Sequence, residues 1–228
     1  MKLAILACAA TALAQTPVAH SPVVVELFTS EGCSSCPSAD ALLSSIAKSS
    51  PGVEVIALSE HVDYWNQLGW RDPFSSAQFT ERQQNYARRF GIRGPYTPQM
   101  VVDGRWEFVG SDRERLARAL REAAGNPKPR VAMRLDGDSL AIALPDGVMG
   151  EAWLAITEDG LTSDVRRGEN GGRTLRHDAV VRRLVKLGGG KELRYAWKPD
   201  ASWKSPRAVV FVTGDDGRVL AAGSLGAL

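Results

Sequence analysis

The chain has 228 residues, of which 44% are hydrophobic and 24% are charged. This length and composition suit one large folded domain or two small ones. The formal net charge is only +2 at pH 7, which argues against nucleic acid or an anionic membrane surface as a partner. No later stretch is long and apolar enough to cross a bilayer, so we expect no stable membrane anchor.

The N-terminus has the three parts of a secretory signal in order. A positive charge at Lys2 is followed by a short apolar stretch and by the small residues Ala12 and Ala14 of a cleavage site. We therefore predict a signal peptide over residues 1–14. The mature chain is expected to be periplasmic or secreted.

Only two of the three cysteines remain once Cys8 leaves with the signal peptide. Cys33 and Cys36 stand three residues apart, a spacing that lets a disulfide open and close with little adjustment. A bridge over so short a loop adds little stability. In an oxidising compartment we expect this pair to be bonded or to cycle between thiol and disulfide, with chemistry as its purpose.

The next elements have the pattern of a βαβ unit. Apolar runs over residues 23–28 and 53–59 flank a helical pattern over residues 35–48. The two strands of such a unit are parallel, so their C-terminal ends share one edge of the sheet. Cys33 follows the first strand and His61 follows the second. We therefore expect these two side chains to be neighbours at the edge where open sheets bind ligands.

The start of the helix predicts different roles for the two cysteines. Cys33 lies at the helix N-terminus, where free N–H groups and the helix dipole favour a thiolate and lower its pKa. Cys36 lies one turn further and is expected to be the buried, resolving thiol.

Residues 61–95, called the insertion below, are predicted to be largely helical. Its best helix has Ser76 as a candidate cap and Gly91 as a stop signal. The insertion either covers the site or shapes a partner groove, or it only adds to the core.

A composition change at residues 123–130, with one glycine and two prolines, indicates a linker. After it, short strands alternate with turn signals, which predicts a β-sandwich-like domain over residues 130–228. Seven strands are expected: 131–135, 139–144, 151–158, 176–187, 193–198, 208–214 and 218–223.

Two motifs resemble thioredoxin-like proteins, in the glutaredoxin style. They are "VVVELFTSEGCSSC" around the cysteines and "YTPQMVVDGRWEFVGSDRERL" over residues 96–116. The resemblance implies an α/β thioredoxin-like domain over residues 22–125, interrupted by the helical insertion. It also implies that Thr97–Pro98 is a cis bond, packs against the disulfide and binds substrate.

More closely, the whole chain resembles a bacterial family of exported proteins of unknown function, which join such a domain to a β-rich one. "HVDYWNQLGWRDPF" and "GENGGRTLRHDAVVR" carry this resemblance. Ser34 and Ser35 differ from the residues usual between the cysteines of thioredoxin-like enzymes, so no redox potential follows from it.

Two further residues are candidates for proton transfer. Glu26 lies in the first strand, where several thioredoxin-like enzymes place an acid behind the resolving cysteine; the alternative is a solvated glutamate. His61 either tunes the thiolate or holds a loop.

These features favour an exported thiol-disulfide oxidoreductase or redox-active disulfide carrier, with Cys33 and Cys36 as catalytic residues. Its partners are expected to be exported protein thiols or disulfides, and no cofactor or resident metal is expected. One alternative is a copper-delivery module that binds Cu(I) through the two thiols, with His61 as a third ligand. Another is a binding protein that keeps the fold without catalysis.

Overall fold

The structure, a computed structural model, describes residues 21–226. The predicted signal peptide, residues 1–14, lies outside the described residues. No helix among residues 21–226 is long and apolar enough to cross a membrane.

The βαβ unit at the start of the chain positions the cysteines. Strand β1 (Pro22–Thr29), helix α1 (Cys36–Lys48) and strand β2 (Glu54–His61) follow each other as the sequence predicts. β1 and β2 are parallel, and their register pairs Thr29 with His61 at the C-terminal ends. The cysteine turn and the segment after His61 therefore leave the same edge of the sheet.

The sheet continues on the other side of β1 with two antiparallel strands, β3 (Gln99–Val102) and β4 (Trp106–Val109). Helix α3 (Arg113–Ala124) follows them and packs on the same sheet face as α1. The core of this layer contains Val23, Val25, Leu27, Leu42, Leu43, Met100, Phe108, Leu116 and Leu120.

The insertion contains a short 3-10 turn, η1 (Asn66–Leu68), and helix α2 (Ala77–Phe90). The side chain of Ser76 caps α2 by accepting a hydrogen bond from the backbone of the first turn, and Gly91 ends it with a left-handed φ of 66°. Both signals are confirmed. α2 packs through Phe79 on the sheet face opposite α1.

The second half of the chain joins the same sheet, which differs from the separate domain that the sequence predicts. The strand order is β13-β12-β7-β10-β2-β1-β3-β4. β10 pairs in parallel with β2 through Val180 and Ser59, and thereby satisfies backbone groups that would otherwise form an open edge. The nine strands are β5 (Ala132–Asp136), β6 (Ser139–Ala143), β7 (Glu151–Glu158), β8 (Leu161–Val165), β9 (Arg173–His177), β10 (Val180–Lys186), β11 (Glu192–Ala196), β12 (Arg207–Thr213) and β13 (Val219–Leu225).

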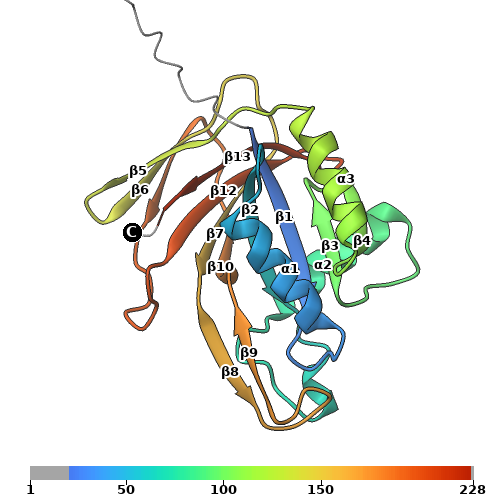
Figure 1. Cartoon of the computed structure of the whole chain (residues 1–228). Helices are drawn as coiled ribbons and strands as arrows, with labels where there is room; N and C mark the ends of the chain where they lie inside the picture. Colours follow the sequence, from blue (N-terminus) through green and yellow to red (C-terminus); the bar gives the residue numbers. More distant parts are fainter. Residues whose placement is uncertain (1–20, 227–228) are drawn as a thin grey trace, which may run out of the picture.

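Two smaller sheets complete the fold (Figure 1). The β11-β6-β5 sheet packs on β7, β12 and β13, so this part of the chain has two β layers. The β8–β9 hairpin extends beyond the large sheet, on the side where α1 begins (Figure 1). This hairpin brings residues from late in the sequence to the cysteine turn.

One predicted strand, residues 176–187, is divided into β9 and β10. Ala179, between them, has a φ of 56°, a left-handed conformation that interrupts a strand. β8 was not predicted, because its polar and half-buried residues give a weak apolar signal.

Candidate functional site

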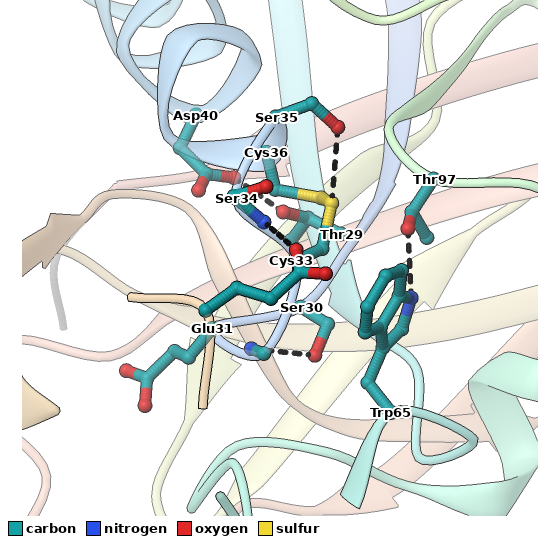
Figure 2. Close-up of a disulfide and its surroundings, with 12 residues drawn as sticks. Thr29, Ser30, Glu31, Cys33, Ser34, Ser35, Cys36, Asp40, Trp65 and Thr97 are labelled. Atoms are coloured by element: carbon teal, nitrogen blue, oxygen red, sulfur yellow. Dashed lines mark hydrogen bonds between the residues drawn. A yellow bond between two sulfur atoms is a disulfide. The ribbon is translucent and has the colours of Figure 1, made fainter. Parts of the chain in front are cut away.

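Cys33 and Cys36 form a disulfide at the start of α1, with their Cα atoms 5.4 Å apart (Figure 2). Both cysteines are buried, with relative exposures of 1% and 0%. Ser34 and Ser35 between them are exposed. Burial of Cys36 is confirmed, but Cys33, which was expected to be the attacking thiol, is equally covered in this oxidised form.

The turn before the disulfide is fixed by close packing and by backbone hydrogen bonds. The N–H of Cys33 donates to the carbonyl of Ser30 at 3.2 Å, and the N–H of Cys36 donates to the carbonyl of Cys33 at 3.2 Å. A Cβ atom at Gly32 would lie 3.0 Å from the Cβ atom of Trp65. Because Gly32 has no side chain, the segment after β2 can approach the cysteine turn this closely.

The Thr97–Pro98 bond is cis, as the resemblance implied. Trp65 donates its indole N–H to the Thr97 hydroxyl at 2.9 Å, and both side chains lie on one side of the disulfide (Figure 2). A Cβ atom at Gly110 would lie 3.1 Å from the Cβ atoms of both Pro98 and Ala39. The proline therefore packs close to the first turn of α1, while its role in substrate binding stays a prediction.

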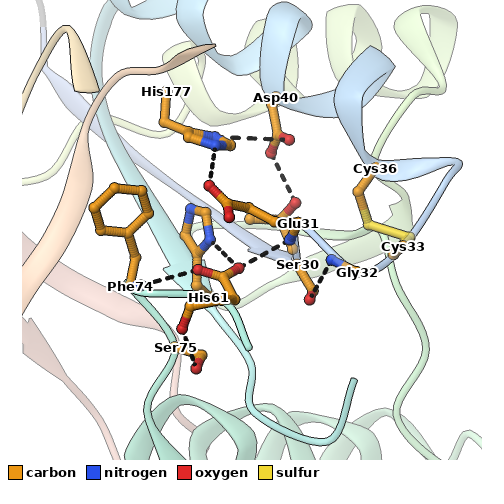
Figure 3. Close-up of polar contacts among 12 residues, drawn as sticks. Ser30, Glu31, Gly32, Cys33, Cys36, Asp40, His61, Phe74, Ser75 and His177 are labelled. Carbon is orange, nitrogen blue, oxygen red and sulfur yellow. Dashed lines mark hydrogen bonds and ion pairs between the residues drawn. A yellow bond between two sulfur atoms is a disulfide. The ribbon is translucent and has the colours of Figure 1, made fainter. Parts of the chain in front are cut away.

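A buried glutamate, Glu31, is the centre of a polar cluster behind the disulfide (Figure 3). One carboxylate oxygen accepts a hydrogen bond from Trp70 Nε1 at 2.7 Å, and the other lies 3.0 Å from His177 Nε2. Its backbone N–H donates to Asp72 Oδ2 at 2.8 Å, and its carbonyl accepts from Asn170 Nδ2 at 2.8 Å. Glu31 thereby ties two distant segments, one containing Trp70 and Asp72 and the other containing Asn170 and His177, to the cysteine turn.

His61 and Asp72 form a buried pair in this cluster. Nδ1 of His61 lies 2.7 Å from Oδ2 of Asp72. Burial alone would lower the pKa of His61, but the Asp72 carboxylate raises it above the ordinary value. The pKa of Asp72 is lowered because His61 outweighs the effect of burial. His61 thus bonds to Asp72 within the cluster and lies beside the His177 ring, with ring centroids 4.9 Å apart.

Asp40 belongs to this cluster and lies on the same helix as Cys36. It lies four residues after Cys36 on α1, so the two side chains share one helix face. It accepts a hydrogen bond from the Thr29 hydroxyl at 2.7 Å, and its other oxygen lies 3.9 Å from His177 Nδ1. Burial raises the pKa of Asp40, although His177 and His61 oppose this rise.

Glu26 does not belong to this cluster, which corrects its predicted role beside Cys36. Side chains alternate along a strand, and Val25 and Leu27 face α1, so Glu26 points to the opposite face. There Arg82 of α2 donates to it from Nε at 2.6 Å. The alternation could have been read from the sequence.

A second buried carboxyl, Glu60, lies next to Glu26 on β2. Neither of its oxygens accepts a hydrogen bond from a donor within residues 21–226. Burial raises the pKa of Glu60 well above the ordinary value, the charge of Glu26 raises it further, and Arg82 opposes the rise. A protonated Glu60 that donates to Glu26 accounts for this arrangement.

Glu60→Gln is expected to stabilise the protein at alkaline pH. Because the pKa of Glu60 is higher in the folded than in the unfolded chain, wild-type stability falls as pH rises from the unfolded value of about 4.3 through the folded value. The amide of Gln keeps the donor and cannot ionise. In urea denaturation, the free energy of unfolding of Glu60→Gln minus that of wild type should be larger at pH 9 than at pH 5 by about 1–2 kcal/mol. The exposed Glu122→Gln should show no such change, and a flat difference between wild type and Glu60→Gln would contradict the assignment.

No group of three or more His, Cys, Asp or Glu side chains within residues 21–226 is arranged to hold a metal ion. His61, the third ligand of the copper alternative, has its Nδ1 bonded to Asp72. Its Nε2 has no hydrogen-bond partner among the described residues, so the copper alternative stays a prediction.

The comparisons with known proteins give a family. A family model described as "Protein of unknown function (DUF1223)" matches residues 24–215. The chain belongs to this family. A crystal structure of a protein from Agrobacterium tumefaciens is 30% identical, with a TM-score of 0.76, and the match covers 90% of this chain and 94% of that one. HBP35 of Porphyromonas gingivalis matches at 12% identity and a TM-score of 0.58, over 91% of this chain and 75% of that one, which shows a similar fold alone. No curated protein matches.

The two segments that carried the resemblance to such a family both reach the cysteine turn. The first segment, "HVDYWNQLGWRDPF", contains His61, Trp65, Trp70 and Asp72. Asn170 and His177 come from the second. In this member of the family, three separate motifs therefore form one site.

Sequence reasoning placed the cysteine turn and His61 at one edge of the sheet, where the structure has them, and missed most of their partners. Glu31 and Asp40 were within reach, because they lie beside the cysteine motif and on its helix. No local sequence signal indicated the contacts of His177 and Asn170, because their partners lie more than 130 residues away in the sequence.

Proposed function

We propose that this protein is a thiol-disulfide oxidoreductase or a redox-active disulfide carrier that acts through Cys33 and Cys36. The observation that carries the proposal is the position of the pair, at the start of α1 and beside buried groups that can exchange protons. A purely structural bridge needs no such neighbours. A bridge over so short a loop also adds little stability.

The exchange reaction has two steps. In the reduced protein, the Cys33 thiolate attacks a partner disulfide; a Cys33–partner bond forms, and the other partner sulfur leaves as a thiolate. Cys36 then loses its proton and attacks Cys33 Sγ, which closes the Cys33–Cys36 disulfide and releases the second partner thiolate. Two electrons pass to the partner, whose thiolates take up two protons. The same steps in reverse oxidise a partner dithiol.

Asp40 is the group to which we assign the Cys36 proton. It is ready for this role because it shares a helix face with Cys36 and because burial raises its pKa toward the working range. His177 lies beside Asp40, with Nδ1 3.9 Å from the second carboxylate oxygen, which is beyond direct hydrogen-bond distance. It also lines a groove of about 470 Å³ between α1 and the β8–β9 hairpin, which offers a route to solvent.

The order of the first elements supports a thioredoxin-like assignment for residues 22–125. A parallel β1-α1-β2 unit is followed by antiparallel β3 and β4 and by α3. In such a domain the backbone of Thr97 would bind an extended partner segment by strand addition. The N-terminal signal pattern favours a partner protein in the periplasm or outside the cell.

Mixed-disulfide trapping with Cys36→Ala tests the proposal directly. Without the resolving thiol, the bond between Cys33 and its partner cannot be released by the protein itself, so covalent complexes should accumulate in the exported fraction. Non-reducing electrophoresis detects them, and mass spectrometry identifies the partners. We expect at least a tenfold accumulation over wild type.

The matched controls are Cys33→Ala and the double variant, which should trap nothing. Absence of complexes with Cys36→Ala, together with no reduction of insulin by the reduced wild type, would remove the exchange function. Capture that persists in Cys33→Ala would instead indicate a binding protein without catalysis.

A further inference from the structure

The loop between β8 and β9, residues 166–172, covers the cysteine turn. It comes from the second half of the chain, yet it contacts the backbone on both sides of Cys33. Gly168 within it has a φ of 77°, and a Cβ atom there would lie 3.3 Å from the Cβ atom of Trp70. The loop therefore also packs closely against the segment that follows β2.

Asn170 makes the central contact of this loop. Its side chain is completely buried, and Nδ2 donates to the carbonyls of Glu31 at 2.8 Å and of Cys33 at 2.9 Å. Its Oδ1 accepts from Arg173 Nη1 at 2.7 Å. The side chain is thus held from both ends, and its amide occupies the backbone acceptors of the cysteine turn.

Glu169 makes the outer contact. Its Oε2 accepts a hydrogen bond from the N–H of Ser34 at 2.9 Å, at the exposed side of the turn. Hydrogen bonding by Ser34, first through its side chain and then through its backbone N–H, lowers the pKa of Glu169 below its ordinary value. Asn170 and Glu169 therefore bind the residues before and after the Cys33 side chain.

The disulfide itself is covered in this structure. A thiolate must approach a sulfur in line with the bond that it breaks, and Cys33 is only 1% exposed. Cys36 is completely buried. The thiol of a partner protein is attached to a polypeptide chain, which needs more room than the closed turn provides.

We propose that loop 166–172 is a gate over the Cys33–Cys36 disulfide, and that Asn170 must release the cysteine turn before a protein thiol can attack. The inference rests on the proposed exchange function for its biological purpose. Opening breaks the two hydrogen bonds of Asn170 and the one of Glu169. It frees the carbonyls of Glu31 and Cys33 for the backbone of an incoming partner.

The rate of chemical reduction of the disulfide tests the gate independently of partners. Full-length oxidised protein is treated with tris(hydroxypropyl)phosphine, an uncharged reductant that attacks one sulfur and, with water, gives the phosphine oxide and the two thiols. Thiol release is followed over time. Loss of the two Asn170 hydrogen bonds in Asn170→Ala should raise the rate constant about tenfold.

The matched control is Thr174→Ala, which removes an exposed side-chain contact of the same hairpin to Asp164. Its rate should stay within twofold of wild type. Where Asn170→Ala does not fold, Glu169→Ala removes the outer contact and should still raise the rate about threefold. The neutral reductant keeps the lost charge of Glu169 from affecting this result.

A reduction rate for folded Asn170→Ala within twofold of wild type would overturn the gate. Where Asn170→Ala does not fold, a rate for Glu169→Ala equal to that of wild type would overturn it. Failure of the proposed function gives a different result, namely faster phosphine reduction in the variants without any exchange with protein thiols. Exchange with protein thiols but unchanged phosphine rates would remove the gate alone.

Discussion

Arg82→Ala is expected to lower the free energy of unfolding by about 3–5 kcal/mol, one of the largest effects of any single substitution in this chain. Arg82 bonds to the buried Glu26 and lies 3.6 Å from Glu60. Removal of its guanidinium would leave a buried carboxylate without its cation. Its stacking on Tyr86, Trp153 and Phe211, at 5.2–5.5 Å from the ring centroids, would also be lost.

Urea denaturation followed by circular dichroism measures this loss. Arg88→Ala on the same helix is the control, because Arg88 contacts the Asn85 side chain at an exposed position and should change stability by less than about 0.5 kcal/mol. A loss below about 1 kcal/mol for Arg82→Ala would mean that Glu26 and Glu60 are both neutral, or that their carboxyl groups reach water once Arg82 is removed.

Asp40→Asn is expected to slow the closure of the protein's own disulfide about 100-fold, which is the usual contribution of a positioned proton acceptor. In the reaction proposed above, the Asp40 carboxylate takes the proton of Cys36. Burial holds the pKa of Asp40 above its ordinary value. The wild-type rate should therefore fall as pH decreases through this raised pKa, and the variant should lack that step.

Stopped-flow release of a fluorescent thiol from a Cys33 mixed disulfide, measured from pH 4 to 9, separates the two effects. Ser38→Ala, an exposed change on the same turn of α1, serves as the control and should leave both rate and pH profile unchanged. Closure within threefold of wild type together with an unaltered pH profile would exclude Asp40 as the acceptor.

The sequence predicted elements whose signals are local. Ser76 and Gly91 bound α2 as expected, because capping and left-handed termination depend on the residues at the helix ends themselves. The parallel pairing of β1 with β2 followed from the connecting helix. The cis Thr97–Pro98 bond followed from the resemblance to a known motif.

Contacts between distant segments were beyond this reasoning. The pairing of Val180 with Ser59 depends on which strand edge is left open after the first half has folded, and no periodicity in either strand encodes it. The role given to Glu26 failed for a different reason. The sequence shows that Glu26 faces the opposite side of the strand from Val25 and Leu27. It does not show which of these two sides packs against α1, and the prediction needed both.

Chain order has a consequence for how the covered disulfide arises. Asn170 contacts the carbonyl of Cys33 across 137 residues, and His177 reaches Glu31 across 146. During synthesis from the N-terminus, both cysteines emerge long before the segment that will cover them. Their first oxidation can therefore take place in an open nascent chain, whereas any exchange of the kind proposed above would have to pass the completed fold.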